Sequence, residues 1–301
     1  MSNLEEHIIK SFKERGVSDS TIKLYLFQLR QLNNGEIENL NKFEDINYIM
    51  NKLKKYKINT VRTKLIAVIA MLKAFPENKL IEQYSEIVAD INKQTNLTSK
   101  EKSETQKKNW VTKDEIMQIW EALEDVVKSF KKNISEKQYN VLLQFMVLSL
   151  FVLINPRRNA DYAKMIVVKK MEKDLSTDYN YLDLQKRKFI FNNFKTKKTY
   201  SQQVEDIPDD LLNVLKIYLK YKPTETNYLL CDYEGKPLPH VNSITLILNK
   251  IFHKKVGSSL LRNIFLSDKF EKLQPMLDEL KEVTNSMGTS SGNAINNYIK
   301  K

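Results

Sequence analysis

The chain has 301 residues, of which 42% are hydrophobic and 29% are charged. This balance is typical of globular proteins, and it excludes a mainly disordered chain; the length suits two domains. Lysine and arginine number 49 against 37 aspartate and glutamate residues, so the formal net charge is +12. Such a basic chain favours a polyanionic partner, with nucleic acid ahead of an anionic membrane surface.

Cysteine and histidine usage excludes several kinds of site. Cys231 is the only cysteine, so the sequence has no intrachain disulfide framework and no cysteine-rich metal site. His7, His240 and His253 show no metal-ligand spacing, and a glycine-rich phosphate loop is absent from the sequence. We therefore expect neither a metal nor another cofactor.

The sequence also points to a compartment. A lone cysteine favours a reducing environment, and the first residues lack the basic and then apolar order of a signal peptide. The longest apolar run, residues 141–154, is too short to cross a bilayer and predicts a buried helix. We expect a cytoplasmic or nuclear protein that is not secreted and has no membrane partner.

Residues 1–98 are predicted to be helical throughout, because their apolar residues recur at helical spacing. We expect a first helix that ends at Gly16 and a second that is capped by Ser18 or Ser20 and broken at Asn33-Asn34-Gly35. Three more helices are expected: one over 43–56, one that ends before Pro76 and one over 78–92. Short polar joints between helices favour a compact bundle, which forms the first expected domain.

A polar stretch separates this bundle from the rest of the chain. Residues 96–109 contain one apolar residue, so they predict a solvated linker, assigned to 99–109. The alternative is a charged extension of the preceding helix. The second expected domain covers 110–301.

The second domain begins with helical signals. Thr112 and Glu115 fit a capping box in front of a helix over 116–130, and the buried helix follows over 138–154. Alternating or β-branched residues then predict short strands over 179–184, 188–194 and 199–207. Further helices are expected over 209–221, 241–253, 257–267, 269–283 and 291–299. The fold class is therefore mainly α with a small β-sheet.

Two segments carry arginines that suit an anion. Arg157 and Arg158 open a helix in the sequence Asn-Pro-Arg-Arg-Asn-Ala-Asp-Tyr, where free N–H groups and guanidinium groups can bind phosphate. Taken alone, this pair could instead be a surface pair bonded to Asp161. Arg262 lies within an otherwise apolar helix, where it needs a carboxylate or a bound phosphate as counter-charge.

Two further segments carry a lysine and a tyrosine. Lys198 lies in the basic turn 194–200 at the tip of the predicted hairpin, from which a lysine can reach a phosphate site and act as a general acid. The alternative is a turn that touches DNA or only solvent. A glycine-containing turn at 286–292 precedes a short helix that ends at Tyr298.

The order Arg, Lys, Arg, Tyr in an α-rich domain after a basic helical bundle resembles the tyrosine recombinase (phage integrase) family over nearly the whole chain. The resemblance places Arg158 and Arg262 at two catalytic arginines of the family and Lys198 at its catalytic lysine. It places Tyr298 at the nucleophile, at the family's spacing after the Gly-His turn. The Arg-Arg-Asn-x-Asp-Tyr and Phe-Lys-Thr-x-Lys patterns resemble recombinases of large eukaryotic DNA viruses and their associated mobile elements.

The sequence departs from the family at its histidines. Ser259 and Thr289 stand where the family has imidazoles, and Asn263 stands where a third histidine is common. A hydroxyl can donate a hydrogen bond to a phosphate oxygen but cannot hold a proton near neutral pH. The candidate catalytic residues are Arg158, Lys198, Ser259, Arg262, Thr289 and Tyr298.

The resemblance implies that 1–98 is a core-binding domain and 110–301 a catalytic domain, which clamp double-stranded DNA. It implies a site-specific recombinase or integrase in which the Tyr298 hydroxyl attacks a phosphate, forms a 3′-phosphotyrosyl intermediate and releases a 5′-hydroxyl without metal or cofactor. Arg158 and Arg262 would neutralise the growing charge, and Lys198 would protonate the leaving oxygen. Strand exchange implies a homotetramer on two DNA sites.

Three alternatives remain open at this point. A type IB topoisomerase uses nearly the same residues as a monomer and relaxes supercoils. A DNA-binding protein with a recombinase fold and impaired catalysis would explain the missing imidazoles at 259 and 289. A basic helical adaptor with no DNA role is the third alternative.

Overall fold

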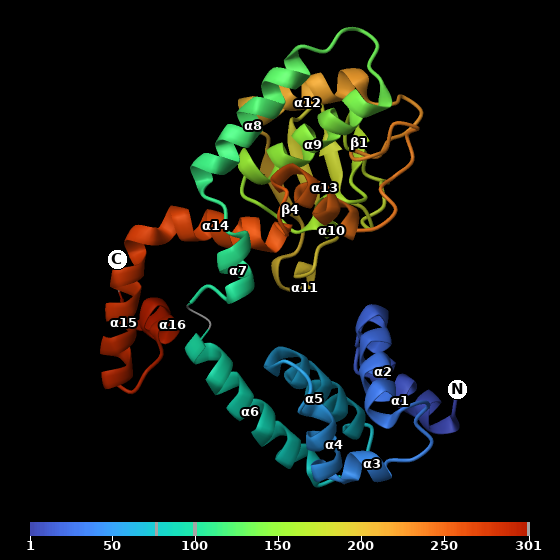
Figure 1. The fold of residues 1–301 in the computed structure, drawn as a ribbon, viewed down its shortest axis with the longest axis vertical. Helices are drawn as coiled ribbons and strands as arrows, with labels where there is room; N and C mark the ends of the chain where they lie inside the picture. The colour runs from blue at the N-terminus through green and yellow to red at the C-terminus, as the bar shows by residue number, and fades with distance from the viewer. Residues whose placement is uncertain (76–77, 99–100, 300–301) are drawn as a thin grey trace. The chain divides into compact units, whose positions relative to one another are not determined.

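The computed structural model describes residues 1–75, 78–98 and 101–299, and it divides the chain into two compact units, Met1–Lys102 and Ser103–Lys301. Figure 1 shows the helices and strands of both units. Pro76, expected to follow the fourth helix, and residues 99–100 of the predicted linker lie outside the described residues.

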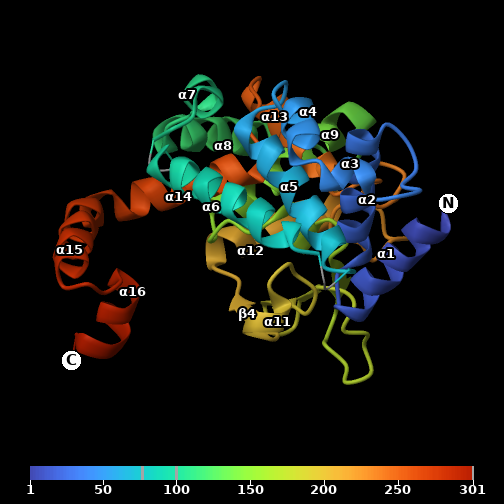
Figure 2. The ribbon, with the colours of Figure 1, turned by 90° about the horizontal axis from the view of Figure 1, so that it is seen from below.

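The described part of the first unit is helical. Its helices are α1 Asn3–Glu14, α2 Asp19–Asn33, α3 Asn41–Glu44, α4 Ile46–Leu53, α5 Ile58–Leu72 and α6 Leu80–Thr98. The Ser18 side chain caps α2 by accepting a hydrogen bond from the N–H of Thr21, and Asn34 ends it in the left-handed conformation. Helix α5 packs against α2 and α6 (Figure 2).

The prediction of one helix over 43–56 is wrong. The backbone of Asp45 is extended, and this residue separates α3 from α4. Its carboxylate accepts a hydrogen bond from the N–H of Tyr48 and so starts a new helix. Apolar residues recur at helical spacing through both helices, so the sequence pattern alone predicts a single helix.

An ion pair between a buried carboxylate and a partly exposed arginine ties the first two helices together. Glu5 of α1 is completely buried, and its carboxylate accepts hydrogen bonds from Arg30 Nε at 2.9 Å and Nη2 at 2.6 Å. It also accepts the N–H of Ile37 at 3.1 Å. The Arg30 hydrogen bond lowers the pKa of Glu5 although burial opposes this effect.

The second unit combines helices with a small mixed sheet. Its elements are α7 Glu104–Asn109, α8 Lys113–Lys128, α9 Glu136–Val152, α10 Asn159–Tyr162, β1 Ile166–Val168, β2 Tyr181–Asp183, β3 Lys188–Phe191, α11 Lys197–Tyr200, β4 Gln203–Asp206, α12 Asp209–Tyr221, α13 Asn242–Phe252, α14 Ser258–Phe270, a 3-10 turn Glu271–Leu273, α15 Gln274–Ser286, α16 Ser291–Asn293 and a π turn Ala294–Tyr298. The structure confirms the prediction of a mainly α chain with a small sheet.

The four-stranded sheet has the order β1-β2-β3-β4. Strand β1 is parallel to β2, whereas β2, β3 and β4 pair antiparallel. The sequence analysis missed β1, because three residues are too few to show an alternating pattern. The predicted strand 199–207 shortens to β4, because one helical turn, α11, occupies the tip of the hairpin.

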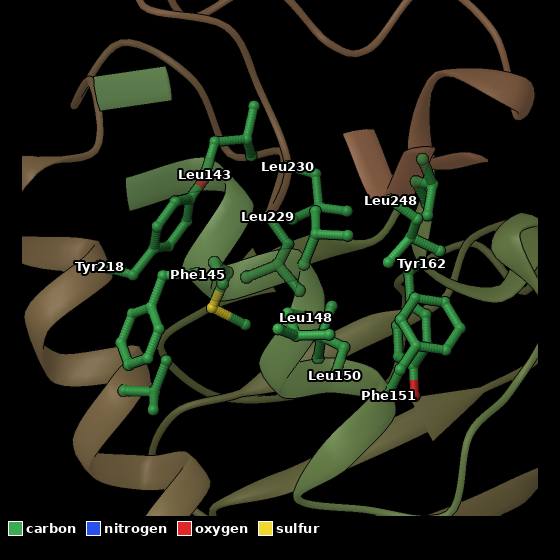
Figure 3. Close-up of a cluster of buried hydrophobic side chains, with 14 of the residues drawn as sticks. Leu143, Phe145, Leu148, Leu150, Phe151, Tyr162, Tyr218, Leu229, Leu230 and Leu248 are labelled. Atoms are coloured by element: carbon green, nitrogen blue, oxygen red, sulfur yellow. The ribbon is translucent and has the colours of Figure 1, made fainter. Parts of the chain in front are cut away.

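Helix α9 forms the centre of the second core. It packs against α8, α12, α13 and α14, and its middle is buried on all sides. Figure 3 shows part of this core, where the Phe151 ring lies edge-on to Tyr162 with centroids 6.1 Å apart. Each large apolar side chain buried here stabilises the fold by about 1.5–3 kcal/mol. In the described ranges, no helix is both long and apolar enough to cross a membrane.

Part of the predicted solvated linker is structured. Ser103 and Gln106 form a capping box that starts α7. Asn109, at the end of this helix, is buried, and its Oδ1 accepts the N–H of Lys255 at 2.9 Å. Helix α7 therefore belongs to the second unit, which begins at Ser103 instead of Trp110.

Candidate active site

A cleft of about 390 Å³ lies in the second unit at the start of α10, beside β4 and α14. Its lining residues are Asn155, Pro156, Arg157, Arg158, Asp161, Phe194, Thr196, Tyr200, Gln203, Glu205 and Arg262. The two arginines predicted to share one anion, Arg158 and Arg262, thus line the same cleft although 104 positions separate them in the sequence.

Arg157 is a fixed part of the wall. Its Nε donates to Asp161 Oδ2 at 3.0 Å, and its Nη1 donates to Glu205 Oε1 at 2.7 Å. The guanidinium carbon lies 3.7 Å from the centroid of the Phe191 ring and 5.4 Å from that of Phe194. These contacts tie the start of α10 to β4, so Arg157 stabilises the cleft instead of offering its charge to a ligand.

Arg158 and Arg262 are half-buried and free in comparison. Arg158 occupies the N-cap position of α10, and Arg262 lies in the second turn of α14. Within the described residues, neither side chain forms a hydrogen bond or an ion pair. Both guanidinium groups therefore remain available for an anion in the cleft.

The charges of the cleft suit a singly charged anion. Three guanidinium groups, those of Arg157, Arg158 and Arg262, oppose the two carboxylates of Asp161 and Glu205, which leaves one positive charge. Burial raises the pKa of Asp161, although Arg157 opposes this effect. A phosphodiester carries one negative charge and would leave the occupied cleft neutral.

Lys198 lies next to the cleft but does not line it. It is exposed on α11, whereas Thr196, just before this helix, and Tyr200, its last residue, do line the cleft. Ser259 is also exposed, in the first turn of α14, three residues before Arg262 and so on the same side of the helix. The structure thus places these two candidates beside the arginine cleft without direct contact to an anion position.

Thr289 and Tyr298 do not line the cleft. The hydroxyl of Thr289 accepts a hydrogen bond from Asn293 Nδ2 at 2.9 Å, and the Tyr298 side chain is 61% exposed. In 271–299 the buried residues are Thr284 and Ala294, and α15 packs against α16 (Figure 1). The structure therefore does not bring the candidate nucleophile to Arg158 and Arg262.

Sequence reasoning missed several residues of the cleft. Glu205 lies on β4 and fixes Arg157, and Tyr200 and Gln203 complete the wall on the side of the hairpin. One signal was available, because strand alternation puts Gln203 and Glu205 on the same face of β4. Strand alternation does not predict that this face of β4 packs against the start of α10.

No model of a protein family matches the chain, and no curated protein matches it. Among the residues that the structure describes, no three His, Cys, Asp or Glu side chains are placed to hold a metal ion.

Proposed function

We propose that this protein is a site-specific DNA recombinase that cleaves and rejoins duplex DNA through a 3′-phosphotyrosyl intermediate at Tyr298. One observation carries the proposal: Arg158 and Arg262, which form no ion pair with any residue that the structure describes, line one cleft beside a lysine-bearing turn. This arrangement supports the assignment of Arg158, Lys198 and Arg262 that the resemblance implies. The charge of +12 supports DNA as the partner.

The two arginines would bind the scissile phosphate. Each guanidinium can donate two parallel hydrogen bonds to non-bridging oxygens. Negative charge grows on these oxygens as the phosphorus becomes five-coordinate, so fixed cations stabilise the transition state more than the ground state. Arg157 holds the start of α10 in place and thereby positions its neighbour Arg158.

In the proposed reaction the phenolic oxygen of Tyr298 bonds to phosphorus and the bond to the 5′ oxygen breaks. The Lys198 ammonium would give its proton to that leaving oxygen, which is released as a hydroxyl. The phenolic proton would pass to solvent, because Ser259 and Thr289 cannot accept it near neutral pH. The phosphotyrosyl bond conserves the energy of the broken phosphodiester, and attack by the 5′-hydroxyl reverses the step.

Delivery of Tyr298 requires a change in position. The segment 271–299 must turn toward the cleft of its own chain, or a second copy must supply the tyrosine. We propose that assembly of four copies on two DNA sites brings the tyrosine to the arginines. Residues 1–98 would bind the opposite face of the duplex as a core-binding domain.

The test is the search for a covalent adduct. The full chain is incubated with nicked duplexes taken from the DNA that flanks its gene, in which the nick lets the cleaved fragment diffuse away. Denaturing electrophoresis should show a protein–DNA species. The species should vanish in Tyr298→Phe and persist in the matched control Tyr200→Phe, whose tyrosine lines the cleft. An adduct with Tyr298→Phe would show that another residue is the nucleophile.

A DNA-binding protein with impaired catalysis is the second candidate. The observation in its favour is that Tyr298 and Thr289 lie outside the cleft and that hydroxyls stand at both imidazole positions. Duplex binding by the wild-type chain without any adduct, over substrates and pH, would favour this candidate.

A further inference from the structure

A second cleft of the second unit, of about 960 Å³, lies between α7 and the C-terminal end of α13. Three lysines and a histidine line it, namely Lys108, His253, Lys254 and Lys255. We propose that this cleft, which we call the α7–α13 cleft, binds the phosphate backbone of duplex DNA at a site separate from the arginine cleft.

The walls of the α7–α13 cleft are fixed by internal contacts. The capping box of Ser103 and Gln106 starts α7, and the hydrogen bond from the N–H of Lys255 to Asn109 Oδ1 joins its end to the chain after α13. Since Asn109 is buried, this contact is part of the fold. The lysines therefore extend from a preformed surface.

The charges of this cleft are uncompensated. Lys108, Lys254 and Lys255 are exposed, and none of the three forms an ion pair in the described part of the chain. The one carboxylate in the lining, Glu104, is paired with Lys107 at 2.8 Å. A concave surface with cations of one sign focuses the electrostatic potential and favours a polyanion. The lining has no Phe, Tyr, Trp or aliphatic residue, which disfavours an apolar small molecule.

Helix α13 connects the neighbourhoods of the two clefts. Asn159, next to Arg158, donates through Nδ2 to Thr245 Oγ1 at 2.8 Å, which joins α10 to the first half of α13. His253 caps the other end of this helix. Thr245 and His253 are separated by about 12 Å along the helix axis, from a rise of 1.5 Å per residue. One DNA strand places a phosphate about every 3.4 Å along its axis, so this distance spans roughly three to four phosphates.

This spacing allows one duplex to reach both sites, with the scissile phosphate at the arginines and a flanking phosphate at the lysines. In Figure 1, α7 and α11 lie at the lower end of the second unit, and Figure 2 shows them at opposite edges of that end, so a duplex that reaches both would cross it. The choice of duplex DNA as ligand rests on the proposed function, whereas binding at the lysines does not need the chemistry of Tyr298.

The experiment measures the salt dependence of binding to a fluorescent duplex by the full chain. The double variant Lys108→Gln/Lys255→Gln keeps the backbone contact of Lys255 and removes two ammonium groups. The magnitude of the slope of log affinity against log salt concentration should fall by about 1.8, which corresponds to two lost phosphate contacts. The matched control is Lys137→Gln/Lys216→Gln, which removes two exposed lysines of α9 and α12 and should leave the slope unchanged.

The outcomes separate this inference from the proposed function. A reduced slope in a chain that forms no adduct supports the cleft and contradicts the chemistry. An unchanged slope in a chain that does form the adduct overturns the cleft and leaves the chemistry standing. Vesicles of phosphatidylcholine and phosphatidylserine form a second arm, and a loss of binding confined to these vesicles would also overturn the inference. Thermal unfolding of both double variants checks that the fold is intact.

Discussion

Arg157 and Arg158 are neighbours in the sequence, but their side chains have different surroundings. Arg157 is nearly buried between Asp161 and Glu205 and lies over the ring of Phe191. Arg158 lines the same cleft without an ion pair. One arginine therefore serves the fold, and we propose that the other binds the ligand.

Substitution of these two arginines should separate stability from activity. Arg157→Gln leaves the buried Asp161 carboxylate without its cation, and we expect a loss of about 3–5 kcal/mol in the free energy of unfolding. Arg158→Gln should change that free energy by less, about 0.5 kcal/mol, because among the described residues its side chain forms no hydrogen bond or ion pair and acts on Asp161 only through its charge. Urea unfolding followed by the fluorescence of Trp110 and Trp120, both in the second unit, measures the difference.

The cleavage assay gives a second readout for Arg158. Arg158→Gln should slow adduct formation by about 10²–10³-fold, as expected for the loss of a fixed transition-state donor. Equal stability losses in the two variants would contradict the assignment of Arg157 as the structural arginine.

Glu5 provides a pH test in the first unit. Its pKa is lowered in the fold, chiefly by the hydrogen bond from Arg30. The ionised carboxylate therefore stabilises the fold at pH values above the ordinary glutamate pKa near 4.3, and this stabilisation is lost as the pH falls through the lowered value. Glu5→Gln should cost about 1–3 kcal/mol at neutral pH.

Hydrogen exchange of the α1 and α2 amides measures this loss locally, because neither tryptophan lies in the first unit. Acidification should weaken protection in the wild type more than in Glu5→Gln. The same loss of protection in both proteins would show that Glu5 does not carry the acid sensitivity.

At the scale of elements, the short helix α11 carries two lysines next to the arginine cleft. Lys197 and Lys198 are adjacent and both exposed on this one turn, so their substitution changes the charge equally. Only Lys198 falls on the position that the resemblance assigns to the general acid.

We expect Lys198→Ala to slow adduct formation by about 10²–10⁴-fold and Lys197→Ala to have little effect. A substrate with sulfur in place of the 5′ bridging oxygen tests the role directly, because a thiolate leaves without a proton. This substrate should restore the rate of Lys198→Ala but not that of Arg262→Ala. No rescue of Lys198→Ala would mean that the lysine binds DNA without donating a proton.

The segment 271–299 is the other element that bears on function. Met276, Met287, Ile295 and Tyr298 are among its exposed large side chains, and the main contacts of α15 are with α16 and the 3-10 turn before it. A segment with so few buried residues can be repositioned at low cost, which the proposed delivery of Tyr298 requires.

At the scale of the whole molecule, the question is which chain supplies the tyrosine. Mixing Tyr298→Phe with Arg262→Ala should restore adduct formation if Tyr298 of one copy enters the cleft of another. The adduct would then form on the Arg262→Ala chain, identified by a size tag. No adduct from the mixture, although the wild-type chain is active, would show that each tyrosine serves its own cleft.

Much of this protein is determined by its sequence. Apolar spacing and caps located most helices, because these signals are local: Ser18 starts α2, and Thr112 with Glu115 starts α8. Two helix starts were missed because a single capping side chain sets them within a longer stretch of uniform pattern: Asp45 starts α4, and Ser103 starts α7. Composition predicted polarity over 99–109 but not the contact of Asn109 with Lys255, since these residues are 146 positions apart.

The make-up of the arginine cleft is set by contacts between residues far apart in the sequence. From residue chemistry alone Arg157 and Arg158 are equivalent, and only the resemblance selected Arg158 as the candidate; that Arg157 is paired with Glu205 of β4 is visible only in the structure. The meeting of Arg158 and Arg262 could be proposed from a resemblance, but the packing of α14 and α10 around the same core is what places both at one cleft. The position of Tyr298 outside that cleft was visible only in the tertiary structure, because local pattern specifies a helix and its faces, whereas the neighbours of each face are set by how the whole chain packs.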